Sequence, residues 1–73
     1  MEKVRRLHED LGDLLQERRS NAAQLEYLRQ HPHAGVLPQR HAARLQACER
    51  QQAWVDAQIE ATRAAIEREL VTA

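Results

Sequence analysis

Hydrophobic residues recur at alternating steps of three and four positions along both halves of the chain. This heptad spacing places them on one face of an α-helix and is typical of helices that pack side by side. The ladder in the first half consists of Val4, Leu7, Leu11, Leu14, Arg18, Asn21, Leu25 and Leu28, and the ladder in the second half consists of His41, Leu45, Cys48, Gln52, Val55, Ile59, Thr62 and Ile66. The pattern therefore predicts one long amphipathic helix in each half of the chain.

The two ladders match each other when the chain folds back between them. Leu28 then faces His41, Val4 faces Ile66, and the residue numbers of every facing pair add to 69 or 70. Two helices that packed against unrelated partners would have no reason to keep this sum constant. We therefore predict an all-α fold, an antiparallel two-helix hairpin of the coiled-coil type.

The sequence between the ladders indicates where the helices end. It holds both prolines and one of the two glycines, which are the residues that most often interrupt helices. We expect a single helical hairpin over residues 1–73, with one helix over 2–30, a loop over 31–37 and a second helix over 38–70. Pro38 fits the first turn of the second helix, where a missing N–H costs nothing.

The second helix carries another stripe of residues on the side nearly opposite its ladder, at about 100° per residue. This stripe consists of Ala43, Ala47, Trp54, Ala57, Ala61, Ala64 and Ala65. Alanines let a neighbouring helix approach closely, and tryptophan is a frequent anchor at protein interfaces. We therefore predict a protein interface here, for self-association or for a different protein. The alternative is a solvent face filled with alanine because alanine is the best helix former.

The facing pairs at the middle of the two ladders are polar: Arg18 lies opposite Gln52, and Asn21 lies opposite Cys48. Polar residues in an otherwise apolar helix pair lower stability and are best known for fixing register or oligomeric state. We interpret these four residues as setting the register of the hairpin. The alternative is that the helices separate at these four polar residues, which we call the waist, to receive a partner side chain or to exchange helices with another chain.

The composition allows only a narrow core. The chain has 73 residues, and although 42% are apolar, they include one Trp, one Tyr and no Phe. A chain this short has little interior, and an isolated hairpin leaves much of its apolar surface in water. We therefore expect the hairpin to dimerise into a four-helix bundle or to dock on another protein.

Charge and targeting signals narrow the partners. The 11 basic and 11 acidic residues balance, so the sequence does not favour a nucleic-acid partner, which would select a basic surface. No apolar run reaches the roughly 20 residues that span a bilayer, and the first residues lack the apolar segment of a secretory signal. A lone Cys48 suits a reducing compartment. We expect a cytoplasmic protein with no membrane partner and no small-molecule substrate.

No residue pattern in the chain predicts catalysis, a cofactor or a metal site. His31, His33 and His41 surround the loop and Cys48 follows two helical turns later, but their spacing matches no recurrent structural zinc pattern. His31 is expected to cap the first helix instead. No Gly-rich phosphate loop or strand-borne nucleophile is present. We therefore predict that the protein is not an enzyme and binds no metal or cofactor.

These features favour a small protein-binding module, an adaptor, a chaperone or an inhibitor, that acts through its helical hairpin and through homodimerisation. The expected partners are a second copy of the chain, one other protein, or both. Two other classes stay open. One is a small dimeric nucleic-acid-binding regulator, and the other is a structural component of a phage or secretion assembly.

The turn Gly35-Val36-Leu37-Pro38, followed by an amphipathic helix, resembles the turn of the small hairpin co-chaperones that sequester needle subunits in bacterial type III secretion. The resemblance covers this turn and the general architecture, and it implies a chaperone that binds one protein partner. The second helix of this chain departs from the family pattern because it is longer and more charged.

Overall fold

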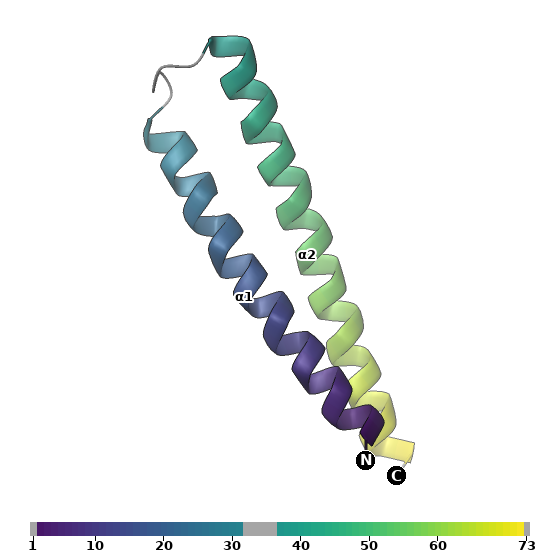
Figure 1. Ribbon diagram of the computed structural model, residues 1–73. Coiled ribbons are helices and arrows are strands. Elements are labelled where there is room, and N and C mark those ends of the chain that lie inside the picture. The colour runs from purple at the N-terminus through teal and green to yellow at the C-terminus, as the bar shows by residue number, and fades with distance from the viewer. Residues whose placement is uncertain (1, 32–36, 73) are drawn as a thin grey trace.

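The computed structural model describes residues 2–31 and 37–72, which form two antiparallel helices, α1 (Glu2–Gln30) and α2 (Pro38–Thr72). The helices pack against each other in a rod of 54 × 14 × 14 Å, and these residues contain no strand (Figure 1). The predicted all-α hairpin architecture is thereby confirmed. α2 extends two residues past the expected end at Leu70. Residues 32–36, which include His33 and most of the turn Gly35-Val36-Leu37-Pro38, lie outside the described residues.

Local signals in the sequence mark both ends of α1 and the start of α2. α1 has Glu2 in its first turn and Arg29 in its last, which is the polarity that the helix dipole favours. The backbone N–H of His31 closes α1 on the carbonyl oxygen of Tyr27 at 3.0 Å. At the start of α2, the carbonyl oxygen of Leu37 accepts the N–H of His41 at 3.0 Å. Pro38 therefore occupies the first helical position, where it needs no hydrogen-bond donor.

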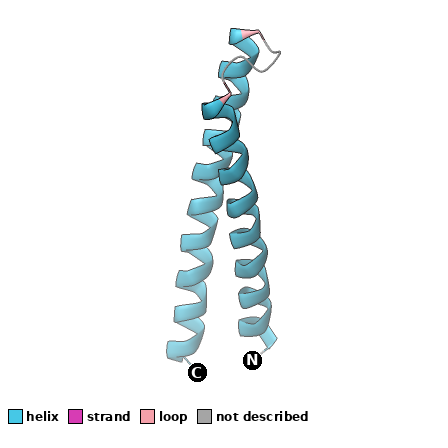
Figure 2. Ribbon diagram, turned by 90° about the vertical axis from the view of Figure 1, so that its left-hand side faces the viewer, coloured by secondary structure: helices cyan, strands magenta, loops and turns pink. Residues whose placement is uncertain are grey.

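The helices meet along the two heptad ladders, which together form the surface that we call the seam. Every ladder position is buried or half-buried, and the most deeply buried side chains are Val55 and Ile59. Near the loop, Leu25, Leu28 and Cys48 form one buried cluster against Leu45. The helices overlap near the loop and separate toward the chain ends in Figure 2, whereas in Figure 1 they lie apart near the loop and overlap at the chain ends, so the direction from α1 to α2 turns along the rod.

Gly12 is the one residue inside a described helix that opposes helix formation strongly. It lies exposed in α1, and a Cβ atom built at this position would meet nothing within 4 Å. The glycine therefore has no packing role that the structure shows, and its cost is the backbone freedom that it loses on folding.

We predict that Gly12→Ala stabilises the protein by about 1 kcal/mol, because alanine loses less conformational freedom in a helix and has room here. Urea denaturation followed by circular dichroism measures the change. The reverse substitution Ala23→Gly, at another exposed position of α1, is the matched control and should destabilise by a similar amount. A Gly12→Ala variant with unchanged or lower stability would contradict this account of α1.

Candidate functional site

Hydrogen bonds from the side chain of Asn21 join the two helices at the middle of the seam. The side-chain amide of Asn21 donates to the backbone carbonyl of Cys48 at 3.0 Å and to Oε1 of Gln52 at 3.1 Å. Asn21 and Cys48, which the sequence predicted to face each other, are therefore in contact. The hydrogen-bond acceptor is the backbone carbonyl of Cys48 and not its thiol. The buried Cys48 side chain packs with leucines instead. A one-residue shift of either helix would break both hydrogen bonds.

Arg18 takes a partner that the facing-pair rule did not predict. Its guanidinium lies 3.8 Å from Asp56 of α2, and Asp56 in turn accepts a hydrogen bond of 3.4 Å from Gln52. Arg18, Asp56, Gln52 and Asn21 thus form one continuous polar chain across the seam. Asp56 lies four residues after Gln52, so helical spacing alone could have identified it. Among the described residues, no buried side-chain polar atom lacks a hydrogen-bond partner, so the waist contains no buried polar side-chain atom that is unpaired.

Two further side-chain contacts link the helices, one beside the waist and one near the chain ends. Gln51 donates to Glu17 at 2.7 Å, and Lys3 lies 3.0 Å from Glu69 near the chain ends. Both link residues that flank the ladders rather than residues of the ladders. Neither contact was predicted from the sequence, because polar side chains that flank two different helices follow no spacing rule within one helix. Each contributes little energy, because its groups are partly in water.

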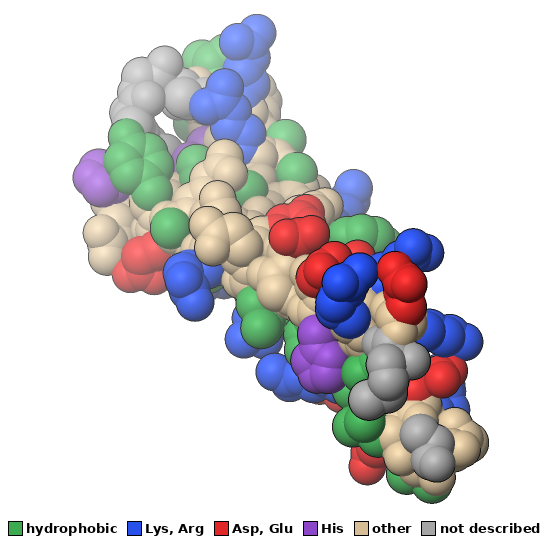
Figure 3. All heavy atoms as spheres, turned by 60° about the horizontal axis from the view of Figure 1, so that its bottom comes forward, with side chains coloured by type: hydrophobic (Ala, Val, Ile, Leu, Met, Phe, Trp, Pro, Cys, Tyr) green, Lys and Arg blue, Asp and Glu red, His purple; other side chains and the backbone are tan. Residues whose placement is uncertain are grey.

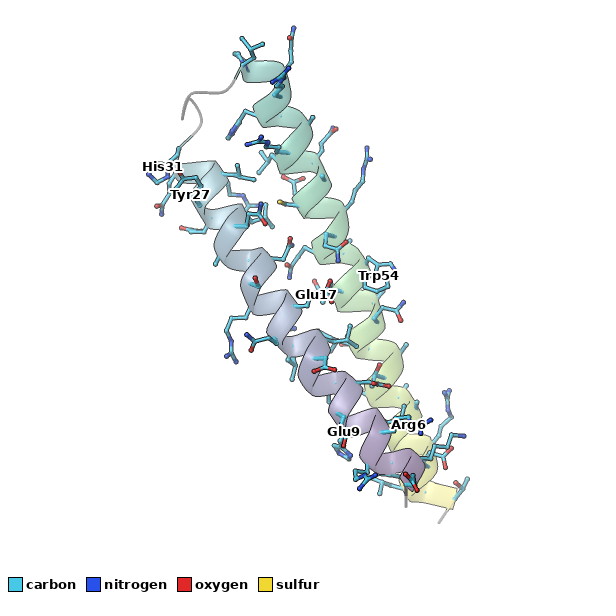
Figure 4. All side chains as sticks on the ribbon, in the orientation of Figure 1. Arg6, Glu9, Glu17, Tyr27, His31 and Trp54 are labelled. Carbon is cyan, nitrogen blue, oxygen red and sulfur yellow. The ribbon has the colours of Figure 1, made fainter. Side chains whose placement is uncertain are left out.

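The side of α2 that faces away from α1 is exposed. Trp54 is 52% exposed and projects outward from the middle of α2, on the side opposite α1 (Figure 4). Ala43, Ala47, Ala57, Ala61 and Ala64 are exposed with it. Ala65 differs from the other residues of the expected stripe, because it is half-buried. Gln58 and Gln51, which precede Ala65 by one and two heptads, are also half-buried. All three residues therefore lie on the flank of α2 that borders α1.

The exposed residues of α2 continue as a heptad ladder of their own. This back-face ladder consists of Ala43, Ala47, Arg50, Trp54, Ala57, Ala61, Ala64, Arg68 and Val71, again in steps of three and four, and all nine residues are exposed. Its last part borders a shallow, mostly apolar depression between Ala64, Arg68 and Val71. Arg68 and Val71 were missed in the sequence analysis, which followed the alanines rather than the spacing. α2 therefore carries one ladder against α1 and another toward solvent.

The loop end of α1 shows a local structural role for its histidine. The rings of Tyr27 and His31 stack with centroids 4.3 Å apart, and both point away from α2 (Figure 4). Nδ1 of His31 lies 3.0 Å from the carbonyl oxygen of Tyr27, so this nitrogen carries the hydrogen. His31 thus caps α1. Across residues 2–31 and 37–72, no three His, Cys, Asp or Glu side chains are grouped so that they could hold a metal ion.

Within the described part of the chain, neither helix has a stretch that is both apolar and long enough to cross a lipid bilayer. Comparisons with models of protein families, with curated proteins and with solved structures find no match to this chain.

The register of the seam can be tested with one new cysteine. We predict that Asn21→Cys forms a disulfide with Cys48 of the same chain under mild oxidation, because facing positions bring Cα atoms within about 7 Å. Mass spectrometry after trypsin digestion without reductant measures the linkage, and Ser20→Cys, on the exposed side of α1, should not form it. If Asn21→Cys produced only disulfides between chains, α1 would pair with α2 of another chain and the hairpin would be wrong.

Proposed function

We propose that the protein is a small protein-binding module that acts as a homodimer, with the back-face ladder of α2 as its binding surface. One observation carries the proposal: Trp54 is half-exposed within a nine-residue heptad ladder on the side of α2 that α1 does not cover. A hairpin that needed only its own fold would need only one ladder on α2. The second ladder has the spacing that recruits another helix.

The energetics of the hairpin support association. Among the described residues, the buried hydrophobic side chains number six, Leu25, Leu28, Cys48, Val55, Ile59 and Ile66. A core of this size gives little stability to a chain of 73 residues. Covering Trp54 and the alanines around it would add apolar burial without changing the hairpin. A buried tryptophan among small residues is a typical binding hot spot, so Trp54 is the residue expected to contribute most.

The charge distribution also supports a protein partner. Charged side chains of both signs lie interspersed along the face drawn in Figure 3, with hydrophobic side chains between them. Equal numbers of acidic and basic residues leave little net charge to keep copies apart at neutral pH. We therefore propose that the hairpin associates with a second copy in the cytoplasm to form a four-helix assembly. As an adaptor, a chaperone or an inhibitor, it would present this assembly to one further protein.

The homodimer makes a direct prediction. The protein should have the mass of two chains, twice 8.4 kDa, at tens of micromolar, and its melting temperature should rise with protein concentration by mass action. Multi-angle light scattering and thermal melts over a hundredfold concentration range measure both. A constant mass of 8.4 kDa with a cooperative melt that does not depend on concentration would rule out the dimer.

Trp54 gives the matched test of the surface. We predict that Trp54→Ala keeps the helical content but weakens the dimer by about 2 kcal/mol, which is about 30-fold in Kd, because it removes a central aromatic anchor. Analytical ultracentrifugation measures Kd. Tyr27→Ala removes an aromatic ring of almost equal exposure, 54%, from α1 and should leave Kd unchanged.

Val55→Ala is the second control, since Val55 is fully buried in the seam next to Trp54 in sequence. It should chiefly lower the stability of the hairpin. If Trp54→Ala left the oligomer and every protein interaction unchanged, the back face of α2 would be a solvent face rich in a good helix former.

A further inference from the structure

The back-face ladder has an order of large and small side chains that is complementary to itself when one copy is reversed. Trp54 is the fourth of its nine residues, Arg50 directly precedes Trp54 in the ladder, Arg68 follows four ladder positions later and Val71 ends the ladder, while alanines occupy the other positions. Helices pack closely where a large side chain on one helix meets a small side chain on the other. The ladder therefore limits how two copies of α2 can pair.

A parallel pair would place equal residue numbers opposite each other. Trp54 would then meet Trp54 and Arg50 would meet Arg50 of the second copy, which crowds two indoles and opposes two cations. An antiparallel pair in which facing residue numbers add to 111 sets none of these residues opposite its own copy. Trp54, Arg50 and Arg68 then each face an alanine: the facing pairs are Trp54 with Ala57, Arg50 with Ala61, Arg68 with Ala43, and Ala47 with Ala64, while Val71 faces Arg40.

The same antiparallel register brings opposite charges together. Glu60 of the second copy would face residue 51, which is one position along α2 from Arg50. The long side chain of Arg50 could therefore reach it. Both side chains are exposed, and among the residues that the structure describes neither makes an ion pair or a side-chain hydrogen bond. Two-fold symmetry would form this pair twice, on either side of the two tryptophans. Such rim charges set orientation more than affinity.

This register also uses the whole of α2. The helix runs from Pro38 to Thr72, and residues 39–72 overlap when facing numbers add to 111. A shift of one heptad shortens the overlap in either direction. One shift sets Trp54 against Arg50, two large side chains, and the other sets Arg50 against Arg68, two cations. The sizes of the facing side chains, the pairing of opposite charges and the length of the helix overlap therefore all favour the same arrangement.

We infer that two copies of the protein pair through α2 in this antiparallel register, with the two-fold axis between Val55 and Asp56. The inference rests on the dimer proposed above and specifies its partner, orientation and contacts. Trp54 of each copy packs on Ala57 and Ala61 of the other. The depression near Arg68 and Val71 receives the first turns of the second α2. The two α2 helices lie at the centre of the four-helix assembly, and the two α1 helices lie outside.

Cysteine crosslinking tests the register. In a Cys48→Ala background, a chain with both Ala47→Cys and Ala64→Cys should form covalent dimers, because these positions face each other and a disulfide needs Cα atoms within about 7 Å. A bond within one chain is impossible, since the two positions are about 25 Å apart along α2. Ala47→Cys alone and Ala64→Cys alone should each stay uncrosslinked, because each cysteine then faces an alanine.

The matched control is Ala47→Cys with Ala57→Cys, whose residues face each other only after a shift of one heptad. We expect the 47 and 64 pair to crosslink at least tenfold faster than this control on nonreducing gels. Faster crosslinking of the control, or crosslinking of a single-cysteine variant, would overturn the register while leaving the dimer in place. A protein that scatters light as a monomer at the same concentration would overturn both the register and the dimer.

Charge reversal gives an independent readout. Arg50→Glu and Glu60→Arg should each raise the dimer Kd several-fold, since each brings like charges together, and the double variant should return Kd to within about threefold of the original. Arg50→Glu combined with Glu67→Arg, whose charges do not meet in this register, should show no recovery. A double variant at 50 and 60 as weak as the weaker single variant would contradict the contact.

Discussion

Two helices packed side by side can each bury only one face against the other, and this limit governs the rest of the molecule. The rod is 14 Å across in both short directions, so no side chain can be far from water except along the seam. The register of the seam therefore decides which residues are buried and which remain available. The hydrogen bonds of Asn21 to Cys48 and Gln52 hold this register at the middle of the rod.

A consequence of this register is that the buried seam and the exposed back-face ladder lie on different sides of α2. Val55 is fully buried and Trp54, its neighbour in the chain, is half-exposed. In the proposed dimer, changes on the back-face ladder would therefore alter association with little effect on the hairpin. The polar side chains at the waist, Arg18, Asp56, Gln52 and Asn21, contact one another, and no buried side-chain polar atom of the described residues is left without a hydrogen-bond partner.

The sequence was sufficient to predict the hairpin because helical periodicity is a local signal and the constant sum of facing residue numbers is repeated along the whole length of both ladders. Each ladder has eight positions, and an error at one would not have changed the pattern. The contacts of long polar side chains could not be predicted in the same way. Arg18 reaches Asp56 rather than facing Gln52 alone, because a long, flexible side chain reaches beyond its own rung. Ala65 was expected on the exposed stripe, but the edge of a stripe depends on how closely α1 covers the flank of α2.

The central claim is that the back face of α2 is covered when two copies meet. Trp54 is the chain's only tryptophan, so quenching of its fluorescence by acrylamide, measured from submicromolar to hundreds of micromolar protein, reports on this face directly. The account predicts that the quenching constant falls and the emission maximum moves to the blue as dimer forms. A quenching constant that stays at its dilute value over the whole range would show that the back face remains in water, and would contradict the account.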